Sequence, residues 1–275
     1  MTHACTSPKY KLVAIDLDGT LLRSDNTVSS RTLAAARACG EAGVTLTIAT
    51  GRMFRSTSPV AETLGLDAPL ITYNGALIRT ARTGETIFHH PMDLDLAREV
   101  LRFFRERHWY IQSYIRDVLY VDTENDKSRY YGNLAFTDPV PLGFELYVPQ
   151  DAPTKLLAIA DDEEQILLMR DSVKAHFGDR LFAAISNPLF LDMASPEVNK
   201  GKSLALLAKR LGVSREETFA IGDSENDLQL FEAAGFRVAM DNARQSLKDA
   251  ADAVTTSNDE DGVALALERY VLENR

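Results

Sequence analysis

The chain has 275 residues, 45% of them hydrophobic and 25% charged, which is enough for two domains with cores of their own. Its formal net charge of −10 argues against binding to nucleic acid or to an anionic membrane, because both require a basic face. The two cysteines, Cys5 and Cys39, have no CxxC spacing, which excludes a disulfide framework and a cysteine-built zinc site and favours a reducing cytoplasm.

The N-terminal part alternates predicted strands and helices. A short tail without the apolar core of a signal peptide leads into the apolar residues 12–15, typical of a strand buried on both faces. Residues 29–43 predict a helix with a serine N-cap and a closing glycine, and further strands are expected at 44–50 and 69–75. This order predicts right-handed crossovers and a parallel, doubly wound, Rossmann-like α/β sheet.

The middle of the chain, roughly 84–189, has a different pattern and predicts an α+β domain inserted after the third strand. Helical periodicity at 94–107 and 162–177 alternates with aromatic, strand-like segments. Those segments are 109–115, 118–122, 144–149, 155–160 and 181–185. The insert leaves the sheet where strands end, so we expect it to cover the pocket there as a lid that admits small molecules.

The C-terminal part returns to the alternating pattern. A helix at 202–212 ends at a glycine, a strand is predicted at 218–223, a second helix at 224–235 and a last strand at 236–240. The predicted domains are therefore a discontinuous α/β core of residues 1–83 and 190–275 and an inserted domain of residues 84–189. No apolar run approaches the roughly 18 residues needed to cross a bilayer.

Polar side chains follow the predicted strands of the core. Ligands of open α/β sheets bind beyond the carboxyl ends of the strands, so these groups should converge on one edge. They are Asp16, Asp18, Gly19, Thr20, Thr50, Gly51, Arg52, Asn74, Gly75, Asp223, Ser224, Asn226 and Asp227, with Lys200 just before a helix expected to start near Lys202.

This set has a chemical logic. Aspartate is ionised at neutral pH and can attack phosphorus without a separate base, provided that a divalent cation relieves the repulsion from the phosphate. Asp16 and Asp223 offer the hard oxygen ligands that suit Mg²⁺. Thr50 and Lys200 would hold the phosphoryl oxygens, and Asp18 could give a proton to the leaving oxygen and later take one from water.

Four segments resemble the motifs of the haloacid dehalogenase superfamily of phosphohydrolases. They are "DLDGTL" at 16–21, "ATGR" at 49–52, "NKGKSL" at 199–204 and "IGDSENDLQLFEAAG" at 221–235. Their order and spacing, with the large insert, resemble the Cof-type branch, which carries an α/β cap of the C2 type. Each motif alone is moderately specific, but all four in this order are very specific.

The resemblance implies a role for each matching position in phosphoryl transfer. Asp16 matches the nucleophile that becomes an aspartyl phosphate, and Asp18 matches the general acid/base, whose backbone carbonyl is also a metal ligand. Thr50 matches the phosphate-binding hydroxyl, Lys200 the phosphate-binding lysine and Asp223 the Mg²⁺-ligating acid.

The flanking positions take supporting roles in the same resemblance. Gly51, Arg52, Asn74 and Asn226 are expected close to bound phosphate or substrate, and Asp227 is expected to support the metal loop. One departure is Asp241, where many relatives carry glycine, so the geometry of its loop is open.

Blander interpretations remain for several of these residues. Arg52 could pair with a surface acid, and Asn199 or Lys202 could contact phosphate in place of Lys200. Asn226 and Asp227 could serve only as residues of a helix N-terminus. A calcium loop of the EF-hand type is excluded, because glycine and glutamate are missing at its sixth and twelfth positions.

The leading expectation is a cytoplasmic, Mg²⁺-dependent phosphatase that hydrolyses small phosphate monoesters. Sugar phosphates are expected first, then nucleotide or cofactor monoesters. The alternatives are a phosphosugar mutase of the same superfamily and a non-catalytic sensor of phosphorylated ligands. A sensor has no use for the nucleophile and its acid/base, and a receiver domain has no use for a large insert. No nucleic acid or membrane partner is expected, and the oligomeric state is unknown.

Overall fold

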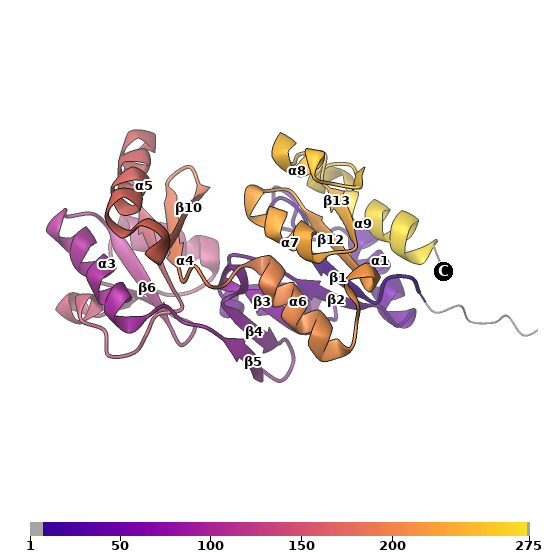
Figure 1. Ribbon diagram of the computed structural model, residues 1–275, viewed down its shortest axis with the longest axis horizontal. Coiled ribbons are helices and arrows are strands. Elements are labelled where there is room, and N and C mark those ends of the chain that lie inside the picture. The colour runs from indigo at the N-terminus through magenta and orange to yellow at the C-terminus, as the bar shows by residue number, and fades with distance from the viewer. Residues whose placement is uncertain (1–7, 274–275) are drawn as a thin grey trace, which may run out of the picture. The chain divides into compact units, whose positions relative to one another are not determined.

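The computed structural model describes residues 8–273, and the predicted N-terminal tail falls mainly outside them. The chain divides into two compact units (Figure 1). The first unit holds the described residues up to Gly51, then Thr57–Ile87, then the described residues from Asn199 onward. The second unit holds Arg52–Ser56 and Phe88–Val198. Each unit is built around a sheet of its own.

The first unit is organised around a five-stranded parallel sheet with the order β14-β13-β12-β1-β2. Its strands are β1 (Leu12–Ile15), β2 (Thr45–Ile48), β12 (Thr218–Gly222), β13 (Phe236–Ala239) and β14 (Ala253–Val254). The central strands β1 and β12 are completely buried, in agreement with the continuous apolar runs in the sequence. The prediction of a mixed α/β fold with a parallel core is confirmed.

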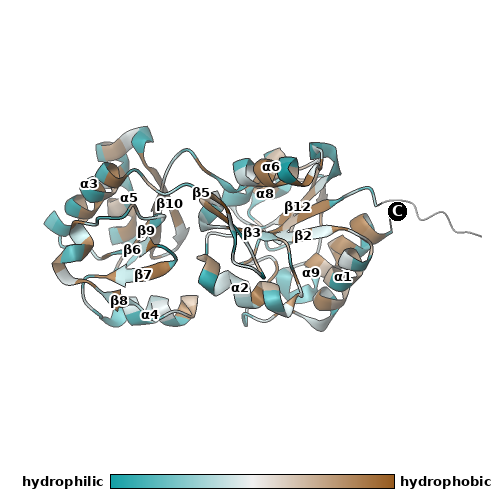
Figure 2. Ribbon diagram, turned by 90° about the horizontal axis from the view of Figure 1, so that it is seen from below, coloured by the Kyte–Doolittle hydropathy of each residue, from teal (hydrophilic) through white to brown (hydrophobic). Residues whose placement is uncertain are grey.

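Helices cover both faces of this sheet. They are α1 (Ser30–Glu41), α6 (Lys200–Leu211), α7 (Leu228–Ala233), α8 (Gln245–Asp249) and α9 (Gly262–Ala266), while a further helix, α2 (Phe54–Thr63), begins in the second unit and ends in the first. Helix α1 packs against α9, and α6 packs against α7. Figure 2 shows α6 on one side of β2 and β12 and α1 and α9 on the other. This two-sided cover explains why the central strands carry no polar face.

The helix boundaries follow local capping rules. The Ser29 hydroxyl accepts a hydrogen bond from the Thr32 N–H at the start of α1, as the sequence predicted. Helix α6 begins at Lys200, two residues earlier than expected, because the Asn199 side chain accepts from the Lys202 N–H. Gly212 ends α6 with φ 68°, a left-handed conformation that glycine adopts without strain.

The predicted third strand is not a full member of the parallel sheet. Strand β3 (Pro69–Thr72) forms a separate antiparallel sheet with β4 (Leu77–Thr80) and β5 (Thr86–His89). It lies beside β2, where the Thr47 hydroxyl donates to the Pro69 carbonyl at 2.6 Å, and Ala49, the residue after β2, forms an isolated parallel bridge with Ile71. The segment after Thr72 turns into a short helix, Tyr73–Gly75, instead of continuing as strand.

The second unit contains a six-stranded mixed sheet with the order β10-β11-β9-β6-β7-β8. Its strands are β6 (Ile111–Ile115), β7 (Val118–Val121), β8 (Val140–Pro141), β9 (Lys155–Ile159), β10 (Phe182–Asn187) and β11 (Phe190–Ala194). This unit extends beyond residue 189, where the sequence predicted its end, because β11 pairs with both β9 and β10.

Three helices pack on this second sheet. Helices α3 (Leu94–Glu106) and α5 (Glu163–Phe177) bury their apolar sides against one face, in a core that includes Phe104, Met169 and Leu191. Helix α4 (Asp126–Ala135) was not predicted from the sequence. It contacts the opposite face, where Tyr131 lies 6.1 Å from Tyr114, ring centre to ring centre (Figure 2).

Two predicted elements differ in the structure. Residues 144–149 are rich in apolar and aromatic side chains and were predicted as strand, but Gly143–Tyr147 form a short 3-10 helix instead. The helix predicted at 224–235 is divided into a 3-10 turn, Glu225–Asp227, and α7, which ends at Ala233. Within residues 8–273, no helix is both long enough and apolar enough to cross a membrane.

Candidate active site

Asp16 lies directly after β1, at the carboxyl edge of the parallel sheet. Its N–H donates to the Ile221 carbonyl of β12 at 2.9 Å, so the backbone continues the sheet pairing by one residue. The side chain is only 5% exposed. Its Oδ1 accepts a hydrogen bond from Lys200 Nζ at 2.5 Å, and its Oδ2 takes no hydrogen bond from a residue that the structure describes. One carboxylate oxygen is thus fixed and the other is available.

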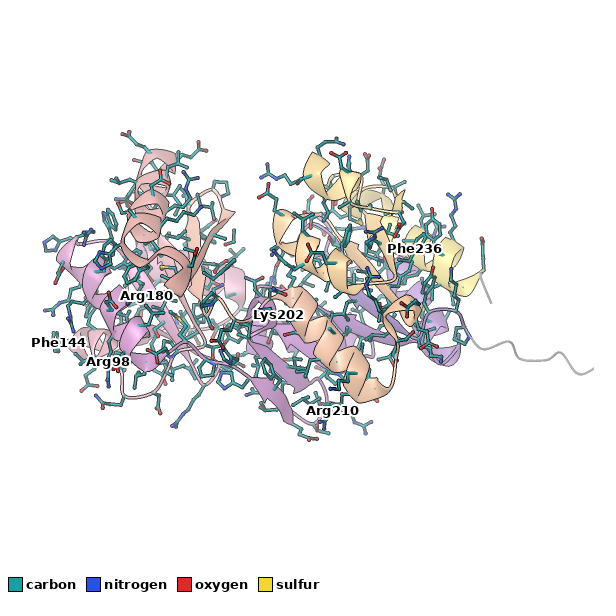
Figure 3. All side chains as sticks on the ribbon, in the orientation of Figure 1. Arg98, Phe144, Arg180, Lys202, Arg210 and Phe236 are labelled. Carbon is teal, nitrogen blue, oxygen red and sulfur yellow. The ribbon has the colours of Figure 1, made fainter. Side chains whose placement is uncertain are left out.

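Lys200 reaches this carboxylate from the first turn of α6. Its ammonium group also donates to Asp227 Oδ1 at 2.7 Å, and the side chain is 1% exposed. Burial acts to lower the pKa of Lys200, but the carboxylates of Asp16 and Asp227 outweigh it and raise that pKa. The lysine is therefore a fixed cation. Asn199 is occupied as the helix cap, and Lys202 is exposed on α6 (Figure 3), so neither replaces Lys200 in this position.

The segment after β12 brings two more carboxylates to the site. Asp223 Oδ1 accepts from the Thr20 hydroxyl at 2.9 Å and its Oδ2 accepts from the Ser224 hydroxyl at 3.0 Å. Asp227 Oδ2 accepts from the N–H groups of Asp223 and Ser224, both at 3.1 Å. Asp227 is completely buried, and its Oδ1 accepts from Lys200, so it joins the loop to the lysine.

The lack of a side chain at two glycines leaves space for these carboxylates. Gly19 has φ 79°, and a Cβ at that position would lie 2.6 Å from Asp223 Oδ2. A Cβ at Gly222 would lie 2.6 Å from the Asp227 carboxyl carbon. Any larger residue would push the acids apart, so both glycines are needed for the close approach of the chain to the site.

The three acids form a cluster in which one oxygen from each of Asp16, Asp223 and Asp227 lies within 4.8 Å of the others. Burial raises the pKa of Asp16 well above its usual range, and the Asp227 carboxylate adds to this against the opposing Lys200 ammonium. The pKa of Asp223 is also raised, by burial first and then by Asp227. One lysine does not balance three carboxylates, so the oxygen-lined cluster fits a divalent cation.

A second group of polar residues joins the ends of β2 and β3 to the loop after β12. The Asn74 N–H donates to the Thr50 carbonyl at 2.9 Å, and the Asn226 side-chain amide donates to Asn74 Oδ1 at 3.3 Å. Asn74 adopts φ 53°, a conformation that asparagine tolerates better than most residues. Thr50, Asn74 and Asn226 are therefore linked by hydrogen bonds, and their role in binding phosphate stays a prediction.

The remaining predicted residues are located by their place in the chain and their exposure. The Asp18 side chain is exposed, two residues beyond Asp16 in the turn that follows β1. Gly51 directly follows Thr50, whereas Arg52 belongs to the second compact unit. Their roles stay predictions. Asp241 does not have a positive φ, so glycine is not required there, and its carboxylate lies 3.4 Å from Lys248 Nζ.

Thr20 and Ser224 have no role predicted from the sequence motifs, although their hydroxyls donate hydrogen bonds to Asp223. Both stand within the strand-end segments that the motifs marked, and a hydroxyl one or two positions from an acidic residue was the available signal. The partner itself could not be predicted, because Thr20 and Asp223 are 203 positions apart in the chain.

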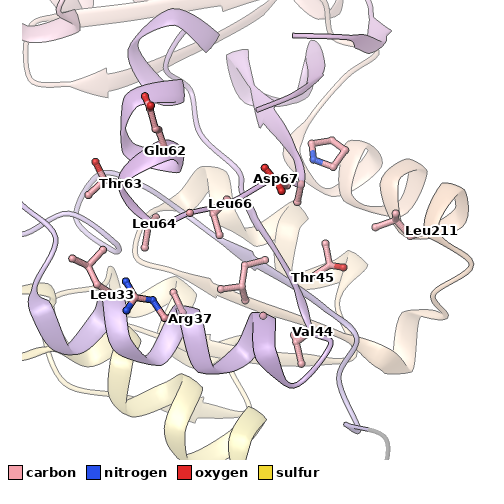
Figure 4. A pocket seen from close by; sticks show the side chains of 16 residues that line it. Leu33, Arg37, Val44, Thr45, Glu62, Thr63, Leu64, Leu66, Asp67 and Leu211 are labelled. Carbon is pink, nitrogen blue, oxygen red and sulfur yellow. The ribbon is translucent and has the colours of Figure 1, made fainter. Parts of the chain in front are cut away.

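Two surface hollows contain none of these residues. The first, of about 700 Å³, lies where β2 and β3 begin, the opposite end from the acids, and Arg37, Glu62 and Asp67 line it together with apolar side chains (Figure 4). The second, of about 560 Å³, is on the second unit and is lined by Arg98, Arg102 and Arg105 of α3 and by Phe144 and Tyr147. Figure 3 shows Arg98 and Phe144 on this part of the molecule. The candidate site is therefore defined by its side chains and not by either hollow.

Comparison with known proteins places this arrangement among hydrolases. The sequence profile of the haloacid dehalogenase-like hydrolases matches residues 13–267. Phosphatase YwpJ of Bacillus subtilis is 32% identical over 279 residues, covering 92% of this chain and 97% of the relative. The B. subtilis 5-amino-6-(5-phospho-D-ribitylamino)uracil phosphatase YwtE is 28% identical over 286 residues, covering 95% and 98%. The crystal structure of TM0651 from Thermotoga maritima superposes with a TM-score of 0.85 at 32% identity, covering 94% and 97%.

Proposed function

We propose that this chain, which belongs to the haloacid dehalogenase-like hydrolase family and is a phosphatase, hydrolyses its substrate through an aspartyl phosphate on Asp16. We propose further that this reaction requires Mg²⁺. The observation that carries this proposal is the state of the Asp16 carboxylate. Lys200 holds Oδ1, while Oδ2 has no hydrogen-bond donor among the described residues and can attack. A nucleophile needs this combination of fixed orientation and an available lone pair.

In the first step, Asp16 Oδ2 would attack the phosphorus of a monoester. A bond forms between that oxygen and phosphorus, the bond from phosphorus to the alcohol oxygen breaks, and Asp18 gives the departing oxygen a proton. In the second step, water would attack the phosphorus and lose a proton to Asp18, which releases Asp16 and inorganic phosphate. The exposed carboxyl group of Asp18 suits exchange of protons with an alcohol and with water.

The transferring phosphoryl group gains charge on its oxygens and needs donors that are already in place. Lys200 supplies a buried positive charge next to Asp16. We assign the remaining contacts to Thr50, Gly51, Arg52, Asn74 and Asn226. The link from Thr50 through Asn74 to Asn226 supports this assignment, because it holds three polar groups in one arrangement before substrate arrives.

The Mg²⁺ proposal rests on the surplus of carboxylates. Asp16 and Asp223, with the Asp18 backbone carbonyl, would hold the cation, and Asp227 would support them, because it is fully buried and already accepts from Lys200 and two N–H groups. When bound, the cation supplies charge that relieves repulsion between the nucleophile and the phosphate. The raised pKa of Asp16 supports the requirement, since a buried nucleophile needs positive charge nearby to stay ionised.

We propose small phosphorylated metabolites as substrates, with sugar phosphates first and nucleotide or cofactor monoesters second. Three relatives that are 28–29% identical are named as phosphatases of 5-amino-6-(5-phospho-D-ribitylamino)uracil, a phosphorylated sugar-alcohol derivative. The net charge of −10 further disfavours nucleic acid as a substrate. The cytoplasmic location and the lid function of the second unit also stay proposals.

A screen of sugar, ribityl, nucleotide and cofactor monoesters with Mg²⁺ tests the substrate class. We expect release of inorganic phosphate without formation of a phosphate isomer, the product that a mutase would give. Preference for a folded phosphoprotein over every metabolite would overturn the substrate class.

The choice of leaving group tests Asp18 as the general acid. Asp18→Asn should slow hydrolysis of an alkyl monoester more than that of p-nitrophenyl phosphate, whose leaving group needs little protonation.

Trapping tests the intermediate. Acid quenching with radiolabelled substrate should recover label on wild-type protein and none on Asp16→Asn. Equal labelling of the two proteins would rule out the aspartyl phosphate on Asp16.

A further inference from the structure

The segment that follows β13 contacts both of the loops that carry the acids of the candidate site. The Arg244 N–H donates to the Asp223 carbonyl at 2.9 Å, so the segment lies beside the loop after β12. Asn242 Nδ2 donates to the Gly19 carbonyl at 2.8 Å, so the segment also reaches the turn after β1. Gly19 directly follows Asp18, the expected general acid. The bond to this turn comes from a side chain, and a substitution can therefore remove it.

A second asparagine contacts the other end of the same turn. Asn258 Nδ2 donates to the Leu22 carbonyl at 2.9 Å, and the Asn258 N–H donates to Asn242 Oδ1 at 3.1 Å. Leu22 is buried, and a buried carbonyl group needs a hydrogen-bond donor. The Leu22 N–H closes the turn by donating to the Leu17 carbonyl at 2.9 Å. Two connected asparagines therefore contact this turn, one at Gly19 and one at Leu22.

The Asn242 carboxamide combines two functions that an aspartate cannot combine. Its NH₂ group donates to the Gly19 carbonyl, and its oxygen accepts from the Asn258 N–H. An ionised aspartate has the same shape and keeps the acceptor, but it has no donor. It would also place a negative charge next to the Gly19 carbonyl oxygen. The contacts of this position therefore require an amide.

The opposite side of the turn faces the acid cluster. The Thr20 hydroxyl donates to Asp223 Oδ1 at 2.9 Å, and a Cβ at Gly19 would lie 2.6 Å from Asp223 Oδ2. The peptide group between Gly19 and Thr20 thus lies between Asp223 and Asn242. Its orientation is set from both sides, one residue after Asp18.

We propose that Asn242 is a positioning residue for the turn that carries Asp18. It acts through the Gly19 carbonyl, with Asn258 as its support, and not through contact with substrate. Proton transfer requires the acid within hydrogen-bond reach of the leaving oxygen, so a displaced turn slows this step. The inference rests on the proposed function, because it assumes that Asp18 is the general acid. All of these contacts lie within the first compact unit.

The choice of leaving group separates positioning of Asp18 from general damage. Asn242→Asp should lower kcat/KM for an alkyl monoester about 10- to 100-fold at saturating Mg²⁺, since a misplacement of about 1 Å can cost about 10²-fold. The loss for p-nitrophenyl phosphate should be much smaller, because its leaving group needs little protonation. Asn242→Ala, which adds no charge, should show the same difference. Equal losses for the two esters would overturn the role, because damage to the fold or to metal binding affects both.

A double variant tests whether Asn242 acts through Asp18. Adding Asn242→Ala to Asp18→Asn should lower kcat/KM for the alkyl ester little further, because both residues serve one step. Losses that multiply would place the effect of Asn242 elsewhere and contradict the inference. If Asp18→Asn itself affected both esters equally, the assignment of Asp18 as the general acid would fail.

The matched control is Ser24→Ala, which removes another hydrogen bond between the same parts of the chain. The Ser24 hydroxyl donates to Asp259 Oδ2 at 2.6 Å, beyond the turn that carries Asp18. This variant should leave the ratio of kcat/KM for the two esters at the wild-type value. A change of that ratio equal to the change in Asn242→Ala would show that any bond in this region has the effect, and Asn242 would lose its specific role.

Amide hydrogen exchange supplies a readout that does not depend on activity. Asn242→Ala should accelerate exchange at residues 19–23, whereas Ser24→Ala should keep the wild-type rates at 19–22. Wild-type exchange at 19–23 in Asn242→Ala would rule out that Asn242 orders the turn. If the wild type hydrolysed no monoester, the proposed function would fail, while exchange would still decide whether Asn242 orders the turn.

Discussion

Each compact unit contains a buried lysine paired with aspartate, and the two sites differ in the number of acids. In the first unit, Lys200 contacts Asp16 and Asp227, with Asp223 in the same cluster, and its side chain is 1% exposed. In the second unit, Lys155 of β9 forms an ion pair with Asp192 of β11, and both side chains are 5% exposed. Burial and residue type are therefore nearly the same in the two places.

The surroundings of the two lysines separate a functional site from a structural one. Lys155 and Asp192 balance each other, and the aromatic ring of Tyr114 lies 5.5 Å from the lysine nitrogen. Lys200 faces three carboxylates and cannot neutralise them. A balanced buried pair is self-contained, whereas surplus charge is costly unless a cation or a charged substrate completes it. The imbalance of charge, and not burial of an ion pair, therefore marks the candidate active site.

The largest expected effect comes from changing the aspartate in each pair to asparagine. Asp16→Asn should lower turnover roughly 10⁴-fold or more, because an amide cannot act as the nucleophile and loss of a nucleophile can cost about 10⁶-fold. Its stability should change little, since Lys200 keeps Asp227 as a partner. Steady-state phosphate release and thermal unfolding measure both quantities.

Asp192→Asn should show the reverse, near wild-type turnover with a loss of about 3–5 kcal/mol in the free energy of unfolding. Turnover by Asp16→Asn near the wild-type rate would remove the distinction between the two sites.

Removal of metal should act on the first site alone. Excess chelator should stop phosphate release, Mg²⁺ should restore it, and Ca²⁺ should do so poorly, because Ca²⁺ prefers longer bonds and more ligands than the roughly 2.1 Å octahedron of Mg²⁺. Asp223→Ala should raise the Mg²⁺ concentration for half-maximal activity by at least about 10- to 100-fold, the range seen when only outer-shell partners of a metal are lost.

The control is Asp192→Ala, which should need the same Mg²⁺ concentration as the wild type after its lower stability is taken into account. Full activity in excess chelator would contradict the metal requirement.

Replacing each lysine with methionine sharpens the comparison further. Lys200→Met should reduce kcat about 10²- to 10³-fold, the usual cost of removing one preorganised donor to developing charge. Lys155→Met should leave kcat unchanged and destabilise the second unit by about 3–5 kcal/mol, because it leaves Asp192 buried without its partner.

The double variant Lys155→Met/Asp192→Leu should recover most of the lost stability, measured by denaturant unfolding, since buried pairs are replaced by apolar residues at little cost. A loss of activity in that double variant that persists at full folding would give the second pair a functional role.

The smallest effect concerns pH in the metal-free protein. Burial raises the pKa values of Asp16 and Asp223 above their unfolded values near 3.9, so the native state binds protons more tightly than the unfolded state. Stability should therefore decrease as pH rises from about 4 through the raised pKa values. Added Mg²⁺ should raise the thermal midpoint most above that range, by about 2–4 °C per kcal/mol of binding.

Asp16→Asn should make the decrease of stability with rising pH less steep, because one of the two titrating acids is gone. An increase of the thermal midpoint of the metal-free wild type across the same pH range would contradict the raised pKa values.

The sequence by itself determined the parts of this protein that depend on local spacing. The apolar residues 12–15 predicted a buried strand, and the structure has β1 there. Ser29 predicted the start of α1, and Gly212 predicted the end of α6. The acids after β1 and β12 were predicted to meet because parallel strands end at one edge, and Asp16 and Asp223 do lie in one cluster. Period and capping are properties of neighbouring residues, so they can be read from the chain.

The partners of the side chains, and the conformation of segments with a weak sequence pattern, depend on tertiary contacts. Residues 144–149 have the aromatic and apolar composition of a strand, but Gly143–Tyr147 form a 3-10 helix, and β3 pairs with β4 instead of extending the parallel sheet. Asp227 accepts hydrogen bonds from Lys200 and from two loop N–H groups. Asp117 accepts from the Phe54 N–H and so caps the helix that begins there. Each of these contacts depends on where distant segments meet, because hydrogen bonds and burial energies act over a few ångströms in space and not along the sequence.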